Sequence, residues 1–398
     1  MYTSAYIWKK HAEMTIFVWL LIGMVLSGPP AEAGNIKKHS PNKYKHKLYH
    51  SNLYLEGKLY YGFVANHHIG MEIYDSHFPA FEINLGKATY GQKFWQQMYN
   101  YPIIGISYYH SGLGTSPYLG TANAVFPYIN FPIIKSKNFM WGFRLGAGVG
   151  YLSKKFNRLD NYKHLAIGSH FNFAGNLLFD LQFRLNDYYF FSADIGLVHF
   201  SNESLKLPNY GLNLPSVSIG LIRFFEKQNT PIQQRLYDPV KPFDYDIYKI
   251  IEFDFTGVAG FKNLDALYGQ NYFVLSLFGN IFKLVGYKSK FGIGCDFSYD
   301  ASDYTILEKN NVIVDNRLSL IKSGLNLAYE LALGRLAFDF NYGMYLGGKD
   351  QSDGSVYQKL SLKYDLSEHL YAYITLKVHW GRADFIGWGL GYKFKLTY

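Results

Sequence analysis

The sequence predicts an all-β protein, a transmembrane antiparallel β-barrel of the kind found in the bacterial outer membrane. The composition is rich in aromatic residues (19%) and in glycine (38 residues), whereas only 17% of residues are charged. A soluble protein of this length normally carries more charge. Residues 101–134 lack Asp, Glu, Lys and Arg, but Gly and Pro interrupt them, so they do not suit a spanning helix. Apolar residues instead alternate with polar residues or glycine, as the strands of a membrane barrel require.

The N-terminus predicts secretion. A Lys-Lys pair at positions 9–10 precedes an apolar run at 14–26, and Ala31-Glu32-Ala33 is a small-residue cleavage pattern. This order of features predicts a signal peptide over residues 1–33. A basic tail, residues 34–56, follows it, and its lysines account for much of the formal net charge of +9. A phosphate-bearing partner such as lipopolysaccharide would also suit that charge.

Period-two alternation predicts the strands. The last strand is the clearest, because every even position from Ile386 to Tyr398 is apolar and the opposite face holds glycine, lysine and threonine. Its terminal aromatic residue resembles the C-terminal assembly signal of bacterial outer-membrane proteins. Similar alternation occupies residues 141–151, 170–184, 335–344 and 370–380. A soluble β-sandwich would alternate too, but its outward face would be the polar one.

We expect about 14–16 strands in two blocks. Residues 57–226 form the first block, the polar segment 227–246 is a linker or a long loop, and residues 247–398 form a C-terminal block that completes the barrel. The alternative is an eight-stranded barrel followed by a second β block. Outer-membrane barrels have short periplasmic turns and long outer loops. The strand at 188–201 follows a minimal turn, so we expect it to run outward.

His199 and Ser201 lie two residues apart at the end of this outward strand. Residues i and i+2 of a strand share a face, so the two side chains lie side by side. A nucleophile activated by a neighbouring base needs this arrangement. Both residues share the apolar face of the strand, which is the face that meets lipid. The competing interpretation is a pair of interfacial polar residues without a chemical role.

The run from His199 to Asn213 resembles the motif of the lipid A 3-O-deacylases of the PagL type, which are outer-membrane barrel esterases. Both contain His-x-Ser-Asn followed by Pro-Asn-x-Gly at this spacing, and a weaker likeness covers residues 60–225. The resemblance implies that Ser201 is the nucleophile, that His199 is the general base, and that a 3-hydroxy fatty acid is released from lipid A. The candidates for the oxyanion hole and its support are Asn202, Ser204, Asn209 and Gly211.

The sequence departs from this family at Asn213, where the family has the glutamate of its triad. Outer-membrane phospholipase A is similar in having His-x-Ser-Asn and an asparagine at this same spacing. An asparagine oxygen can accept a hydrogen bond from the imidazole, but it cannot stabilise the imidazolium with a charge. Glu203 is an alternative partner for the imidazole. Lys206 could meet a phosphate of lipid A or could simply be solvated.

Three functions are therefore compared: a lipid A deacylase, a phospholipase A-type esterase, and a pore or structural barrel that keeps a degenerate motif. We expect no cofactor for the first, whereas a phospholipase-like site would allow calcium. Cys295 is the only cysteine, so no multi-cysteine metal site can form. The expected partners are lipid A or lipopolysaccharide as substrate and outer-membrane lipid, with no nucleic acid. A homodimer is compatible with the sequence.

Overall fold

The computed structural model describes residues 52–228, 247–264, 269–314, 316–350, 352–380 and 382–398. The predicted signal peptide, nearly all of the basic tail and nearly all of the 227–246 linker lie outside these residues. The first strand begins at Leu53, inside the segment assigned to the tail. Among the helices in the described ranges, none is both long and apolar enough to cross a membrane.

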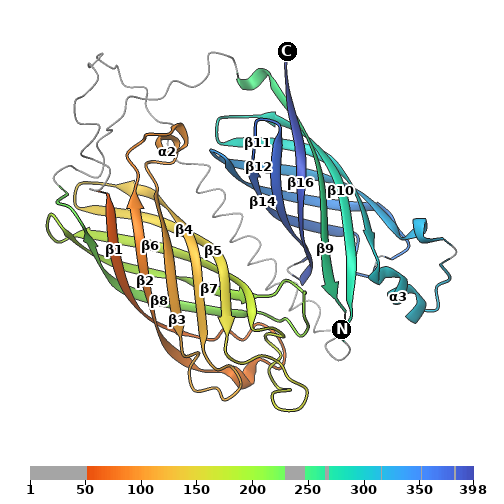
Figure 1. The fold of residues 1–398 in the computed structure, drawn as a ribbon, viewed down its shortest axis with the longest axis horizontal. Helices are drawn as coiled ribbons and strands as arrows, with labels where there is room; N and C mark the ends of the chain where they lie inside the picture. The colour runs from red at the N-terminus through yellow and green to blue at the C-terminus, as the bar shows by residue number, and fades with distance from the viewer. Residues whose placement is uncertain (1–51, 229–246, 265–268, 315, 351, 381) are drawn as a thin grey trace.

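Within these described ranges, sixteen strands form two closed antiparallel barrels of eight strands each (Figure 1). The N-terminal barrel consists of β1 (Leu53–Phe63), β2 (His77–Ala88), β3 (Ile103–Ser111), β4 (Ala122–Lys135), β5 (Phe139–Leu152), β6 (Phe171–Arg184), β7 (Tyr189–Ser201) and β8 (Leu212–Phe224). The C-terminal barrel consists of β9 (Ile250–Asn263), β10 (Asn271–Leu284), β11 (Ser289–Asp300), β12 (Ile321–Leu333), β13 (Leu336–Gly347), β14 (Val356–Asp365), β15 (Leu370–His379) and β16 (Arg382–Thr397). The short helices are η1 (Glu72–Tyr74), α2 (Phe94–Met98), η2 (Ile247–Lys249), α3 (Ser302–Lys309) and η3 (Arg317–Leu320).

The structure confirms the all-β barrel fold. Of the two predicted architectures, it has the alternative one, an eight-stranded barrel followed by a second β block. β1 pairs with β8, for example Leu59 with Ile219, and β16 pairs with β9, for example Trp388 with Ala259. The expectation that the C-terminal block completes one large barrel is therefore wrong. Each block closes on itself, because the strands at its two ends hydrogen-bond to one another and leave no edge.

The distribution of side chains is inverted relative to a soluble protein. In β1, the apolar side chains of Leu55 and Leu59 are 46% and 67% exposed, whereas the charged side chains of Glu56 and Lys58 between them are buried. The other strands alternate in the same way. Apolar side chains on the outside and polar ones in the lumen are what a barrel surrounded by lipid requires.

Ion pairs fill the lumen of each barrel. In the N-terminal barrel, the buried Lys58 ammonium contacts Asp194 at 2.8 Å, and the Arg144 guanidinium contacts Glu56 at 2.8 Å and Glu82 at 2.9 Å. The C-terminal barrel has an equivalent network, in which Lys290 contacts Glu252 at 2.5 Å and Lys363 contacts Glu330 at 2.8 Å. Buried charges need such partners to offset their desolvation.

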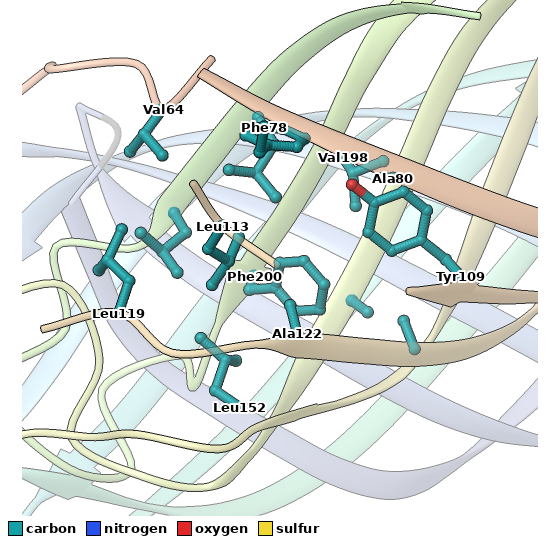
Figure 2. Packing of buried hydrophobic residues seen from close by; sticks show 14 of the residues in the cluster. Val64, Phe78, Ala80, Tyr109, Leu113, Leu119, Ala122, Leu152, Val198 and Phe200 are labelled. Atoms are coloured by element: carbon teal, nitrogen blue, oxygen red, sulfur yellow. The ribbon is translucent and has the colours of Figure 1, made fainter. Parts of the chain in front are cut away.

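An apolar core closes the lumen of the N-terminal barrel at the end that carries its longer loops. Figure 2 shows Phe200 and Val198 of β7 packing among side chains that include Leu113, Ala122 and Leu152. These two residues are fully buried and alternate along β7 with His199 and Ser201. The core therefore fixes the end of β7 from the inside and holds the outward side chains of His199 and Ser201 in place.

The two ends of the barrels differ in the lengths of their connections. At one end, called here the short-turn end, most connections are short, namely those at 136–138, 185–188, 285–288, 334–335 and 366–369, and the exception is the 89–102 connection that carries α2. At the other end, the long-loop end, lie those at 64–76, 112–121, 153–170, 202–211 and 301–320. The 202–211 loop follows Ser201 directly, so the candidate site lies at the long-loop end. This matches the strand direction predicted from the turn lengths.

The barrels contact one another through part of their outer faces. Phe131 and Phe143 point outward from β4 and β5, yet each is only 6% exposed. They form a cluster with Tyr99, which follows α2, and with Leu333 of β12. The Tyr99 hydroxyl also donates to the Ala332 carbonyl at 2.9 Å. The C-terminal barrel thus covers a stripe of the N-terminal barrel that lipid would otherwise cover.

Candidate active site

The pairing of β7 with β8 brings His199 directly opposite Asn213. Directly opposed residues of an antiparallel pair have Cβ atoms about 5 Å apart, within reach of a side-chain hydrogen bond. The His199 Nδ1 lies 2.6 Å from the Asn213 Oδ1. Because the amide oxygen can only accept, this contact requires the proton on Nδ1 and leaves Nε2 as the basic nitrogen.

His199 and Ser201 lie on the outward face of β7, the face on which Ile195 is 61% exposed. This agrees with the parity expected from the sequence. His199 is only partly exposed, and Ser201 is 5% exposed, because the 202–211 loop folds over them. Within the described residues, no hydrogen bond joins the two side chains. Catalytic hydrogen bonds often form only when substrate is bound, so His199 and Ser201 stay candidates for a base and a nucleophile without such a bond.

Two donors surround the Ser201 hydroxyl. The Asn209 Nδ2 donates to Ser201 Oγ at 3.0 Å, and the Glu203 N–H donates to the same oxygen at 3.2 Å. The Asn209 Oδ1 accepts from the Asn202 N–H at 3.0 Å, which orients the amide group. A negative charge that develops beside Oγ would therefore meet an oriented amide and a backbone N–H.

Asn202 has a different position from that expected of an oxyanion donor. Its Nδ2 donates to Ser169 Oγ at 2.9 Å and to the Lys206 carbonyl at 2.8 Å. Both protons of the amide are therefore used within the loops, and the side chain holds the 202–211 loop closed. Lys206 is exposed on the surface of that loop.

Gly211 gives the imidazole its space, and Gly175 lies opposite His199 in the neighbouring strand. A Cβ at Gly211 would lie 3.1 Å from His199 Cε1, and the residue has a φ of +78°, which also favours glycine. Gly175 of β6 is directly opposite His199 on the other side, and a Cβ there would meet the Phe173 ring at 3.1 Å. Sequence reasoning had not assigned a role to Gly175. The signal was present, because this glycine interrupts an otherwise apolar face of β6.

Ser204 links the 202–211 loop to the C-terminal barrel. Its hydroxyl donates to the Ala383 carbonyl at 2.9 Å, and its carbonyl accepts from the Asn263 N–H at 2.9 Å. Glu203 and Ser204 have φ values of +53° and +64°, which non-glycine residues adopt only when the surroundings hold them there. The second barrel therefore stabilises the backbone turn that directs the Glu203 N–H toward Ser201.

The Glu203 side chain does not act as a partner of His199 in this structure. It is 7% exposed, and among the described residues its carboxylate makes no hydrogen bond or ion pair. Burial raises the pKa of this carboxyl group to about 7. A carboxyl group in this environment is largely protonated at mildly acidic pH.

Two clusters outside this site bring possible metal ligands together. They are Asp353, His379 and Asp384 in the C-terminal barrel, and Glu252, Asp254 and Glu330 deeper in the same lumen. Lysines already contact both, since Lys262 lies 2.7 Å from Asp384 and Lys290 lies 2.5 Å from Glu252. These ammonium groups supply the positive charge that a cation would bring.

Comparisons with known proteins give two family matches. Residues 80–221 match the family model described as lipid A 3-O-deacylase (PagL), and residues 251–396 match that described as acyloxyacyl hydrolase, C-terminal domain. No curated protein matches the chain.

Several solved structures are also similar. The crystal structure of the outer membrane enzyme PagL is 17% identical, with 42% of this chain and 97% of that chain covered and a TM-score of 0.30. Neisserial surface protein A is 10% identical, with coverage of 44% and 97% and a TM-score of 0.29. OccK11 (OpdR) of Pseudomonas aeruginosa is 12% identical, with coverage of 87% and 96% and a TM-score of 0.22.

Proposed function

The chain belongs to the lipid A 3-O-deacylase (PagL) family, and we propose that it hydrolyses an acyl ester of lipid A by a Ser201/His199 mechanism. Family membership indicates a hydrolase that deacylates lipid A, and the apolar outer faces of both barrels agree with a bacterial outer-membrane location. The observation that carries the finer proposal is the 2.6 Å contact between His199 and Asn213 on the face that also bears Ser201. The long-loop end is assigned to the cell exterior, where lipid A lies.

Acylation of the enzyme begins when Ser201 Oγ attacks the carbonyl carbon of the acyl ester. His199 Nε2 takes the hydroxyl proton, and the imidazolium keeps its Nδ1–H on the Asn213 oxygen. The carbonyl oxygen becomes negatively charged, and the Asn209 amide and the Glu203 N–H are the nearest donors for it. The ester C–O bond then breaks, His199 protonates the departing sugar oxygen so that it leaves as a hydroxyl, and the acyl group stays on Ser201.

Deacylation repeats these steps with water. His199 takes a proton from a water molecule as that water attacks the acyl-serine carbonyl. Collapse of the second tetrahedral intermediate releases the 3-hydroxy fatty acid and returns the proton to Ser201 Oγ. This sequence balances without a metal or cofactor, so we expect neither to be required. The homodimer allowed by the sequence stays a prediction.

A phospholipase is the second candidate, because Asn213 replaces the glutamate of the deacylase triad. The site resembles that of outer-membrane phospholipase A, in which an asparagine at this spacing is the partner of the histidine. A pore is disfavoured by the buried ion pairs of Lys58, Arg144 and Lys363, which fill the two lumens. The substrate therefore distinguishes the two remaining functions.

The test of the mechanism is a double-mutant comparison on purified protein. Ser201→Ala and His199→Ala should each abolish fatty-acid release from lipid A, and the double variant should lose no more than either alone, because nucleophile and base act as a unit. Each variant should keep the heat-modifiable mobility of a folded barrel. Unchanged fatty-acid release by Ser201→Ala would exclude the mechanism, and losses that multiply in the double variant would show that the residues act separately.

A further inference from the structure

A groove of about 490 Å³ separates the two barrels near their short-turn end. One wall is the cross-strand pair of Ile104 and Ile129 on the outer face of the N-terminal barrel. The opposite wall is the cross-strand pair of Leu336 and Tyr364 on the outer face of the C-terminal barrel. Its volume lies in the range of about 300–1,000 Å³ that is typical of small-molecule sites. Both walls belong to strands whose outward side chains meet lipid.

The end of the groove nearest the turns has a defined shape. Trp95 of α2 packs over the turn between β12 and β13, where a Cβ at Gly334 would lie 2.7 Å from the Trp95 ring. Gly334 has a φ of +78°, so this close approach depends on glycine. Trp95 and Tyr364 are the residue types that prefer the headgroup level of a bilayer. The apolar part of the groove therefore lies at acyl-chain depth and its mouth at headgroup depth.

Two cations, Lys93 and Arg335, line this mouth, one from each barrel. Both residues are exposed, and neither has a salt bridge within the described part of the chain. Asp365, whose backbone N–H donates to the Arg335 carbonyl, has its carboxylate bound to Lys393 at 2.6 Å. The positive charge of the mouth is therefore not neutralised by that neighbouring acid. An apolar groove that ends in two cations is complementary to acyl chains joined to a phosphate.

We propose that this groove binds an anionic glycerophospholipid, with its acyl chain between the two barrels and its phosphate at Lys93 and Arg335. The groove lies at the opposite end of the barrels from Ser201, so its occupant is not the ester-bearing lipid of the proposed reaction. Since each barrel supplies one wall and one cation, a bound lipid bridges the two. The proposal is independent of the esterase mechanism.

The test measures lipid binding by the purified full-length protein in detergent, using native mass spectrometry. The added lipids are phosphatidylglycerol, phosphatidylcholine and lipid A. We expect wild type to bind phosphatidylglycerol at least about fivefold more tightly than phosphatidylcholine, since one cation near a lipid surface contributes about that factor. The double variant Lys93→Glu/Arg335→Glu should lose this preference. Lys137→Glu is the control, because Lys137 is exposed on another short turn outside the groove and the charge change per substitution is the same.

A second variant distinguishes lipid binding in the groove from attraction of the lipid by general surface charge. Ile129→Trp fills the apolar part without altering any charge, and it should weaken binding of phosphatidylglycerol by a similar factor. Equal binding of phosphatidylglycerol and phosphatidylcholine by wild type would overturn the proposal. So would an equal loss in Lys137→Glu and the double variant, unchanged binding in Ile129→Trp, or displacement of phosphatidylglycerol by lipid A. Fatty-acid release from lipid A, measured alongside, reports the esterase separately.

Discussion

Replacement of Asn213 tests how the imidazole is oriented. Asn213→Ala removes the acceptor that lies 2.6 Å from His199 Nδ1. A neutral hydrogen bond of this kind contributes about 0.5–1.5 kcal/mol, and about 1.4 kcal/mol corresponds to a factor of ten in rate. We therefore expect fatty-acid release from lipid A to fall by roughly two- to tenfold. Some rate should remain, because the nucleophile, the base and the donors around Ser201 are unchanged.

Asn213→Glu should have the opposite effect if the protein is a lipid A deacylase. A carboxylate at this position keeps the acceptor and adds a charge that stabilises the imidazolium. Charge-assisted hydrogen bonds are about twice as strong as neutral ones, so a gain of about 1 kcal/mol, or roughly fivefold in rate, is expected. In a phospholipase-type site, where asparagine is the native partner, the glutamate variant should instead lose activity.

The assay is fatty-acid release from lipid A and from a glycerophospholipid, in parallel, for wild type and both variants. Asn123→Ala is the matched control, because Asn123 accepts from His110 Nδ1 at 2.9 Å across β3 and β4. That pair has the same cross-strand register, but position 112, which corresponds to Ser201, is a glycine. Equal activity of wild type and both Asn213 variants would refute the proposed orientation of His199. Activity on phospholipid alone would refute the choice of substrate.

Three further predictions concern the loop and the last strand. Ser204→Ala removes the bond to the Ala383 carbonyl and should lower lipid A deacylation severalfold with unchanged melting of the barrels; unchanged activity would show that the contact does not position the loop. Because burial raises the pKa of Glu203 to about 7, the 202–211 loop should be most stable at acidic pH and lose stability as the pH rises through 7. Limited proteolysis of the loop at pH 5.5 and 8.5 measures this trend, and Glu203→Gln should remove it. An identical trend in wild type and Glu203→Gln would contradict the prediction. Phe394→Asp breaks the stacking on Phe253 at 5.0 Å and exposes a charge to lipid, so the heat-modifiable form should decrease in the membrane fraction; normal assembly would argue against a lipid-facing Phe394.

The alternation of apolar and polar residues predicted the individual strands well, because a lipid-facing strand repeats its pattern over its whole length. The strand expected at 170–184 is β6 at Phe171–Arg184, and that expected at 370–380 is β15 at Leu370–His379. Closure was not predictable in this way. Nothing in the side chains of β1 distinguishes a partner in β8 from one in β16, because closure depends on backbone hydrogen bonds between strands distant in sequence.

The residues that contact the other barrel could not be predicted from the sequence either. Phe131 and Phe143 have the outward parity of lipid-facing residues, and the packing of Tyr99 and of the second barrel buries them. The His199–Asn213 pairing was predicted through the resemblance to the deacylase motif, which has the partner of the histidine at this position, and not from the alternation of residues. The roles of Asn202 and Ser169 depend on how the 202–211 loop folds back, which no local pattern encodes.

The most direct test of the central claim is mass spectrometry of lipid A extracted from cells that produce the wild-type protein or the Ser201→Ala variant at equal levels in the outer membrane. The proposed mechanism predicts that wild-type cells contain lipid A lighter by one 3-hydroxyacyl group, and that cells with Ser201→Ala contain only the intact form. Identical lipid A in the two samples, whether both are deacylated or both are intact, would contradict the account.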